Sequence, residues 1–421
     1  MKYIIWSVNE KDEIFIEDND RVIINIYYLL KLDSTNLNLK YNYIKEKLIN
    51  YIINNKYSIS INYYDINKDI QQLLKYNINH QKMNEIICEI YYILKLLKNK
   101  YKFEYSYTGR NNMKKLDILT HNKPLLIVRI GIIEMRIINF FINNNINIDN
   151  TIKKLMNVSE QEVYKWIGQR SWLSIYKDEL YLETYIKKLM TNAGFYFDNS
   201  KDINYNKNIL MKWRDEYLNG IINCDYLYYQ DGTIPWLLET YDYIFKKYNK
   251  IKESTYLIGH EDFYKIIKNK TVLFLTPFAE LLKTNYETGK YKKLYKNFEI
   301  PDYKLITLNM PLSTYPNKPH HDWLETFNTI ENDIDNIISK NKVDIFICSA
   351  GCYGIPFCNY VFKKYNITSL YFGNSINIYL GVLLNREKNK PNINKENWVI
   401  SDLNKRYKNI EKIEDNCYGY N

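Results

Sequence analysis

The sequence has few cysteines, and their spacing excludes both a disulfide-stabilised domain and a zinc-stabilised domain. Six cysteines in 421 residues do not make a disulfide framework. Cys348, Cys352 and Cys358 lie close together, but no second Cys or His pair has the spacing of a tetrahedral zinc site. The length allows two to three domains of roughly 150 residues each, so a large apolar core can form without staples.

Long apolar runs are missing as well. No uncharged stretch reaches the roughly 18 apolar residues that span a bilayer. The N-terminal sequence MKYIIWSVNEKDE has too short an apolar run for a signal peptide. We therefore expect a cytoplasmic protein, in the host cytoplasm if the source is a virus.

Charge of one sign is only mildly in excess. The 58 Lys and Arg residues outnumber the 48 Asp and Glu residues by 10, and they are interleaved with Asn and Tyr instead of forming a stripe. Nucleic acid is therefore an unlikely partner, whereas anionic small molecules fit this charge equally well. The abundance of Asn, Ile, Lys and Tyr is typical of an AT-rich genome, so we give composition little functional weight. The 46% hydrophobic content indicates a folded chain.

The chain divides into two parts by pattern. Residues 1–110 predict a small N-terminal α+β segment of unknown role, with an amphipathic helix at 83–101, and the polar stretch 106–115 predicts a linker. The second part, 116–421, carries a mainly helical insertion around 151–220.

Short apolar runs alternate with helical patterns in the second part. Strands separated by helices, with nearly all-apolar strand sequences, predict an α/β fold. We expect a Rossmann-like, mostly parallel sheet with helices on both faces. The predicted strands are 125–130, 224–229, 254–259, 271–278, 304–309, 343–351 and 369–373.

A glycine ends the first of these strands, although the chain has only 13 glycines. The carboxyl ends of parallel strands form the ligand-binding edge of such sheets. Gly131 at that edge lets the backbone turn tightly and lets a ligand approach. Arg129 precedes it, and Glu134 follows in the first turn of the next helix. Arg129 and Glu134 at this spacing also fit a structural ion pair.

Three more loops end at the same predicted edge. ICSAGCYG (347–354) brings the Ser349 hydroxyl and the amides of Gly351 and Gly354 to a strand end, where oriented N–H groups can hold a phosphate. A simple strand-to-helix turn fits that loop equally well. TPFAE (276–280) and FGNS (372–375) are the other two loops, and four loops at one edge favour a pocket.

The paired histidines in PHHDWLE (319–325) do not predict a metal site. Adjacent helical residues do not face each other, so His320 and His321 are poorly placed to share an ion. Asp322 and Glu325 fit an N-cap with its capping-box partner.

The order of these motifs resembles the glycosyltransferases of the GT-D fold type, which use a nucleotide-sugar donor. The resemblance covers Asp117 to Asn421. It rests on PLLIVRIGIIEM, NAGFYFDN (192–199), which we take as helical, VLFLTPFAELLKTNY, the DW at 322–323, VDIFICSAGCYGIPFCNYVF, LYFGNSINIYLGV and the tail from Trp398 through KIEDNCYGY. No single piece is specific, so their order and spacing carry the resemblance.

The resemblance implies a site with one departure from the family. The turn after the first strand commonly reads Gly-Asp-Gly-Glu in this family, and its Asp-any-Glu pair is implicated in metal and donor binding. Here it reads Gly131-Ile132-Ile133-Glu134, and isoleucine offers a cation no oxygen. Three alternatives follow: Glu134 alone holds Mn²⁺ or Mg²⁺, Arg129 and lysines neutralise the diphosphate, or the chain binds without catalysing.

The same resemblance implies roles for individual residues and a glycan acceptor as partner. Glu134 is the implied base or metal ligand, and Arg129 orients it or meets the diphosphate. The residues implied in binding the nucleotide-sugar are Gly131, Ser349, Gly351, Tyr353, Gly354, Gly373, Asn374, Ser375, Glu414 and Tyr418.

Three other functions stay open. The missing aspartate fits a catalytically inactive nucleotide-sugar or glycan-binding module. The positive charge and the 43 tyrosines fit a nucleic-acid-associated protein, less well. Another Rossmann-like enzyme, such as a methyltransferase or a dehydrogenase, is disfavoured because no predicted strand is followed by G-x-G-x-x-G.

Overall fold

A computed structural model describes parts of two compact units. The smaller unit comprises residues 1–116 and 229–256, and the larger unit comprises residues 117–228 and 257–421. From the sequence we expected a single division of the chain, near residues 110–116. The described residues are 2–7, 15–18, 21–25, 46, 59–63, 123–143, 148–159, 162, 179–228, 253–255, 259–384, 394–408 and 410.

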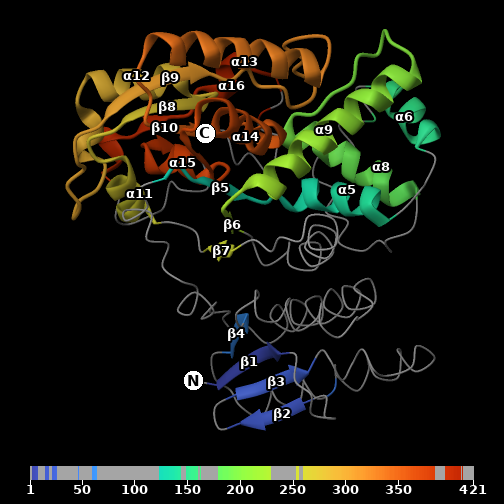
Figure 1. Ribbon diagram of the computed structural model, residues 1–421, viewed down its shortest axis with the longest axis horizontal. Coiled ribbons are helices and arrows are strands. Elements are labelled where there is room, and N and C mark those ends of the chain that lie inside the picture. The colour runs from blue at the N-terminus through green and yellow to red at the C-terminus, as the bar shows by residue number, and fades with distance from the viewer. Residues whose placement is uncertain are drawn as a thin grey trace. The chain divides into compact units, whose positions relative to one another are not determined.

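Six parallel strands form the sheet of the larger unit (Figure 1). Their order is β6-β5-β11-β10-β8-β9, and every neighbouring pair is parallel. This confirms the predicted Rossmann-like α/β class. The strands are β5 (Leu126–Arg129), β6 (Tyr226–Tyr228), β8 (Thr271–Thr276), β9 (Lys304–Asn309), β10 (Ile345–Cys348) and β11 (Thr368–Tyr371).

Helices cover both faces of this sheet, and its inner strands are correspondingly apolar. β10 is buried at every residue, whereas β9, at the edge, is only half-buried. The chain crosses from β8 to β9 through α12 (Ala279–Glu287) and returns to β10 through α13 (Trp323–Lys340). Because parallel crossovers are right-handed, these two opposite moves place α12 and α13 on opposite faces. α14 (Gly354–Tyr365) and α9 (Ile203–Asn223) pack with each other, and α13 packs on α9.

The described part of the predicted helical insertion is largely helical, with one correction. It contains α6 (Asp149–Met156), α8 (Glu179–Lys188), the π-helical turn η3 (Leu189–Ala193) and α9. The segment 192–199 was expected to be helical, but the helix ends at Ala193. Gly194 adopts φ +87°, a left-handed conformation that stops the helix, and the chain continues without helix to Asp198.

The predicted cap of α13 is present. Asp322 accepts a hydrogen bond from the Glu325 amide (2.9 Å), as an N-cap should. The Glu325 carboxylate reaches back and accepts from the His321 amide (2.8 Å), one residue before the expected partner. His320 Nδ1 lies 2.9 Å from the Thr326 hydroxyl, so its ring is anchored to the same helix start.

The remaining described elements complete both units. In the smaller unit, β1 is parallel to β3 and β4, and β2 is antiparallel to β3. Its strands are β1 (Lys2–Ser7), β2 (Phe15–Asp18), β3 (Arg21–Asn25), β4 (Ile59–Tyr63) and β7 (Glu253–Thr255), the last being what is described of the strand predicted at 254–259. The larger unit adds α5 (Ile132–Asn143), α11 (His260–Ile267), α15 (Ser375–Tyr379), β12 (Val382–Leu383), β13 (Val399–Ile400), α16 (Leu403–Arg406) and the short 3-10 turns 290–293, 351–353 and 395–397.

Two predictions fall outside the described residues: the helix at 83–101 and the linker at 106–115. None of the described helices has the length and apolar character needed to cross a membrane.

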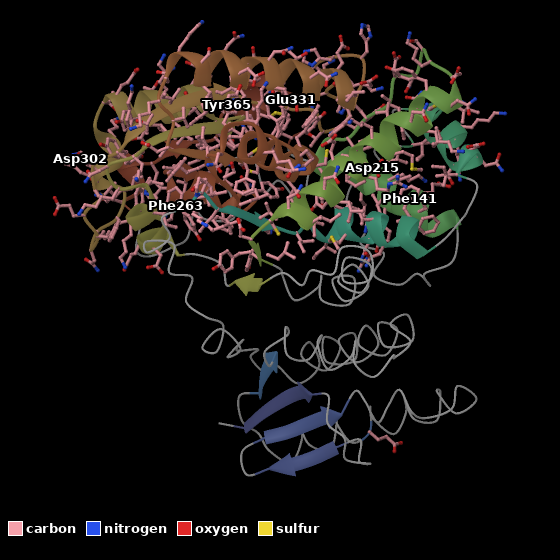
Figure 2. All side chains as sticks on the ribbon, viewed as in Figure 1. Phe141, Asp215, Phe263, Asp302, Glu331 and Tyr365 are labelled. Atoms are coloured by element: carbon pink, nitrogen blue, oxygen red, sulfur yellow. The ribbon has the colours of Figure 1, made fainter. Side chains whose placement is uncertain are left out.

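A carboxylate cluster lies where α9, α13 and α14 meet. Figure 2 labels one member, Glu331 on α13, together with Tyr365 at the end of α14. Burial raises the pKa of Glu331 to about 7, and the negative charges of Glu216 on α9 and Asp335 on α13 add to the rise. Lys364 on α14 and Lys212 on α9 act in the opposite direction, more weakly.

This cluster predicts a pH-dependent stability. The pKa of Glu331 rises from 4.5 to about 7 on folding, so the folded chain binds the extra proton between these values. Protonation of Glu331 therefore stabilises the folded state. This stabilisation is complete below pH 4.5 and is lost as the pH rises through about 7. We expect Glu331→Gln to raise the melting temperature by a few degrees at pH 8 and to change it little at pH 5. Melting curves of both proteins across that range would show it, and an equal shift at every pH would contradict it.

Candidate functional site

The carboxyl ends of four inner strands lie level with one another. Cys348 at the end of β10 pairs with Tyr371 of β11 on one side and with Leu275 of β8 on the other. Tyr371 in turn pairs with Val128 of β5. The loops that follow these strands therefore meet at one edge of the sheet, as predicted for residues 131, 349–354 and 372–375.

Arg129 ends β5 and lies against the loop after β11. A side chain at Gly373, which has φ +61°, would collide with Nη1 of Arg129, so the glycine makes room for the guanidinium. The Nε atom of Arg129 is buried and has no hydrogen-bond partner among the described residues. Nor does the side chain form an ion pair within the described part of the chain. A cationic donor in this state is an unusual feature of a folded protein.

Glu134 lies in the first turn of α5 and bends back over Gly131. A side chain at Gly131 would meet the Glu134 carboxylate, which would have to move to make room for it. Glu134 is only 6% exposed. The Gly131 amide donates a hydrogen bond to the Tyr217 hydroxyl of α9 (3.1 Å), so the helix start is tied to the insertion. This arrangement fits a positioned carboxylate at the edge of the sheet.

Two buried tyrosines face both charges. Burial, and then the negative charge of Glu134, raises the pKa of Tyr217 well above its ordinary value, and a smaller effect of Arg129 opposes the rise. The pKa of Tyr371 is raised well above its ordinary value by the same two causes, again against Arg129. Both phenols therefore remain protonated at neutral pH. The Tyr371 hydroxyl donates to the Gly351 carbonyl (2.9 Å).

A buried hydrogen-bond network joins the ends of β8, β10 and β11. At its centre is Asn377 of α15, which is 1% exposed and was not predicted from the sequence. The Thr276 hydroxyl donates to Asn377 Oδ1 (2.7 Å). The Asn377 amide donates to Ser349 Oγ (2.8 Å) and to Asn374 Oδ1 (2.6 Å). Asn377 thus holds two of the predicted site residues in place.

The two side chains at the ends of this network, Asn374 and Ser349, have unused hydrogen-bond donors. Asn374 accepts through its oxygen, and its Nδ2 atom is buried with no partner among the described residues. Ser349 accepts from Asn377, and none of the described hydrogen bonds uses the Ser349 hydroxyl proton. We refer to Arg129, Asn374 and Ser349 as the donor cluster. Its free N–H and O–H groups are suited to an oxygen-rich anion.

Three predicted residues of the β10 loop serve packing. Gly351 has φ +52°, and a side chain on it would collide with the Ala193 carbonyl, while a side chain on Gly354 would collide with the Tyr371 ring. Tyr353 is fully buried, with its ring between Trp323 (5.3 Å) and Phe357 (5.9 Å). The simple-turn interpretation of this loop is therefore the one that its packing favours.

The other predicted residues lie at the carboxyl edge of the sheet or outside the described residues. Ser375 begins α15 and is partly exposed. Glu414 and Tyr418 lie outside the described residues. The chain before them reaches the edge, because Arg406 donates to the Pro277 carbonyl in the β8 loop (2.7 Å).

The described part of this edge offers Mg²⁺ or Mn²⁺ one predicted carboxylate ligand. Such cations take several oxygen ligands. Glu134 supplies one carboxylate, and Ile132 stands where the family resemblance would place the second. Within the described residues no group of three His, Cys, Asp or Glu side chains is placed to hold a metal. A cation held by this carboxylate would take its other ligands from substrate phosphates, water or residues outside the described part of the chain.

Comparison with protein-family models, curated proteins and solved structures gives no match for this chain. The resemblance to the GT-D fold type therefore stays a prediction that rests on the motifs themselves.

Proposed function

We propose that the larger unit is a glycosyltransferase, which moves a sugar from a nucleotide-sugar donor to the hydroxyl of a glycan or glycoconjugate acceptor. The observation that carries this proposal is the donor cluster beside the Glu134 carboxylate at the carboxyl edge of the sheet. Buried N–H groups without acceptors suit the phosphates of the sugar donor. A buried carboxylate next to them suits the acceptor hydroxyl.

The reaction needs these two kinds of group. The acceptor oxygen forms a bond to the anomeric carbon while the bond from that carbon to the diphosphate oxygen breaks. Negative charge develops on the leaving diphosphate, and the acceptor hydroxyl loses its proton. Donors fixed in advance stabilise the first charge, and a carboxylate takes the proton.

The residues divide between these tasks. In this proposal Arg129, Asn374 and Ser349 contact the diphosphate, and the loop from Gly373 to Ser375 contacts the nucleotide. Glu134 accepts the proton of the acceptor hydroxyl.

Several other assignments remain part of the proposal. The residues concerned act as backbone contacts (Gly131, Gly351 and Gly354) or as parts of a tail that closes on the donor (Glu414 and Tyr418). Tyr353 supports the loop from the core, where its ring is buried.

A second candidate is an inactive nucleotide-sugar-binding module, favoured by Ile132 in place of a carboxylate. It keeps the donor cluster and loses the transfer step. Binding without turnover distinguishes it from the enzyme.

The proposal is tested with the full chain in a thermal-stability screen followed by a turnover assay. A ligand that binds only the folded state raises the melting temperature. UDP, GDP, TDP, CMP and their sugars are compared, with and without Mn²⁺. We expect one nucleoside diphosphate and its sugar to stabilise the chain, and that sugar donor to be consumed with an acceptor. No shift with any nucleotide, alongside a salt-sensitive shift with an oligonucleotide, would overturn the proposal.

A further inference from the structure

The charge of Arg129 needs an anion that the described chain does not supply. Its guanidinium is partly buried, its Nε is fully buried, and it makes no ion pair with a described carboxylate. Burying a charge without a partner is costly, so such a group is retained where a ligand completes it. Gly373 leaves the guanidinium the space that a side chain would fill.

The polar network that includes Asn374, the neighbour of Gly373 in the chain, also has donors without an acceptor among the described residues. The Thr276 hydroxyl accepts from the Phe278 amide (3.2 Å), so its own proton is directed to Asn377 Oδ1. Asn377 must then donate to both Ser349 and Asn374. As a result, Ser349 keeps its O–H and Asn374 keeps its N–H groups for an outside acceptor. Asn377, which is buried at the carboxyl edge of the sheet, thereby acts as a positioning residue for the donor cluster.

The only predicted cation ligand is a single carboxylate. The Glu134 carboxylate covers Gly131 at the start of α5, and its charge acts on the phenols of Tyr217 and Tyr371. A cation held by one carboxylate takes its other ligands from substrate phosphates and water. A guanidinium contacts two phosphate oxygens directly, through N–H groups in a fixed fork.

We infer that the donor cluster binds a diphosphate group directly, with no divalent cation between the protein and the phosphates. Arg129 takes the place of the cation, while Asn374 and Ser349 donate to the remaining oxygens. The diphosphate class of ligand rests on the proposed function, whereas the absence of a required cation rests on the donor cluster alone.

Calorimetric titration of the full chain with inorganic pyrophosphate tests this inference. The titration is run with excess EDTA, and again with Mg²⁺ and with Mn²⁺. We expect binding in EDTA, and no gain in affinity when a cation is added. Since pyrophosphate carries no sugar, the result does not depend on turnover.

Variants identify the residues that bind it. Arg129→Gln should weaken pyrophosphate binding by about tenfold or more, because a charge-assisted hydrogen bond is lost. Asn374→Asp should weaken it by a similar factor, since an acceptor replaces a donor. Arg214→Gln is the matched control: Arg214 is on α9, paired with Asp215, and its loss should change the affinity by less than about twofold.

Further variants guard against a folding defect. If Arg129→Gln melts early, Arg129→Lys keeps the charge and removes the Nε donor, and it should still weaken binding by about threefold or more. Glu134→Gln should leave pyrophosphate binding equal or tighter, because it removes a nearby negative charge. A cation held by Glu134 would give the opposite change.

Binding that appears only with Mg²⁺ or Mn²⁺ would overturn the inference, as would no binding at all. Equal affinities of the wild type and Arg129→Gln would do the same. Sugar transfer that requires Mn²⁺ would sink this inference and leave the proposed function standing. Pyrophosphate binding in EDTA without any sugar transfer would sink the proposed function and leave this inference standing.

Discussion

Replacing Glu134 with glutamine is expected to lower the turnover number for sugar transfer by about 100-fold or more. Glutamine has the same shape as glutamate, so the packing over Gly131 is kept. It cannot accept the proton that the acceptor hydroxyl loses. The KM for the sugar donor should change little, because the donor cluster is untouched. Steady-state kinetics measures both quantities.

Glu280 offers a matched control for this variant. It too lies in the first turn of a helix that follows a strand of the sheet, but it is exposed. Glu280→Gln should leave the turnover number within about twofold, as surface substitutions usually do. Full activity of Glu134→Gln would remove the role of Glu134 as the base.

The largest expected loss of stability follows from replacing Trp323 with alanine. Its side chain is fully buried at the start of α13, and its ring stacks on Phe327 (5.0 Å), Tyr353 (5.3 Å) and Phe195 (6.4 Å). Deleting a buried tryptophan leaves a large cavity and costs about 3–5 kcal/mol. Urea unfolding followed by far-ultraviolet circular dichroism measures the free energy.

Trp323→Phe separates cavity formation from other effects. Phenylalanine keeps a ring between Tyr353 and Phe327, so the loss should be clearly smaller, about 1–2 kcal/mol. If the alanine variant lost no more than the phenylalanine variant, the stack would not be the cause. Phe357 belongs to this stack and lies on α14, the helix that follows the β10 loop. Because disturbing the stack should shift that loop, the alanine variant should also weaken nucleotide binding.

The sheet was predictable because its strands are buried on both faces. Fully apolar strands such as β10 leave a continuous apolar run in the sequence, although the strand itself (Ile345–Cys348) is shorter than the one predicted at 343–351. The segment after Met190 was harder. Its residues Phe195, Tyr196 and Phe197 are all buried, but they pack as extended chain, and apolar content alone does not separate that from a buried helix. Gly194 was the available signal for the end of the helix.

The candidate site was partly predictable, by the rule that parallel strands present their carboxyl ends at one edge. That rule led to Arg129, Glu134, Ser349 and Asn374, and the structure brings all four to this edge. It did not lead to Asn377, which lies beyond the loop, inside α15. The directions of its hydrogen bonds depend on neighbours from β8 and β10, and no local pattern encodes them.

What packs against each strand-end glycine was not predictable from the sequence, for a physical reason. A glycine at a strand end signals a close approach, but the sequence does not say what approaches. At Gly131 and Gly373 the neighbour is a charged side chain, whereas at Gly351 it is the backbone of Ala193. The contacts at Gly131 and Gly373 belong to the candidate site, and the contact at Gly351 belongs to the packing.

The position of β5 in the sheet determines when the site can exist during folding. β5 lies between β6 and β11, and the Leu125 amide bonds to Thr368, 243 residues later in the chain. Pairings over such distances form late, because closing a long loop costs entropy before the contact repays it. β5 and β6 can pair early during synthesis, whereas β11 must leave the ribosome before the two halves of the sheet join. Arg129 comes from the first half, and Ser349 and Asn374 come from the second. The donor cluster is therefore assembled in the same step that closes the sheet, and a nascent chain lacks the proposed anion site until its last inner strand has been made.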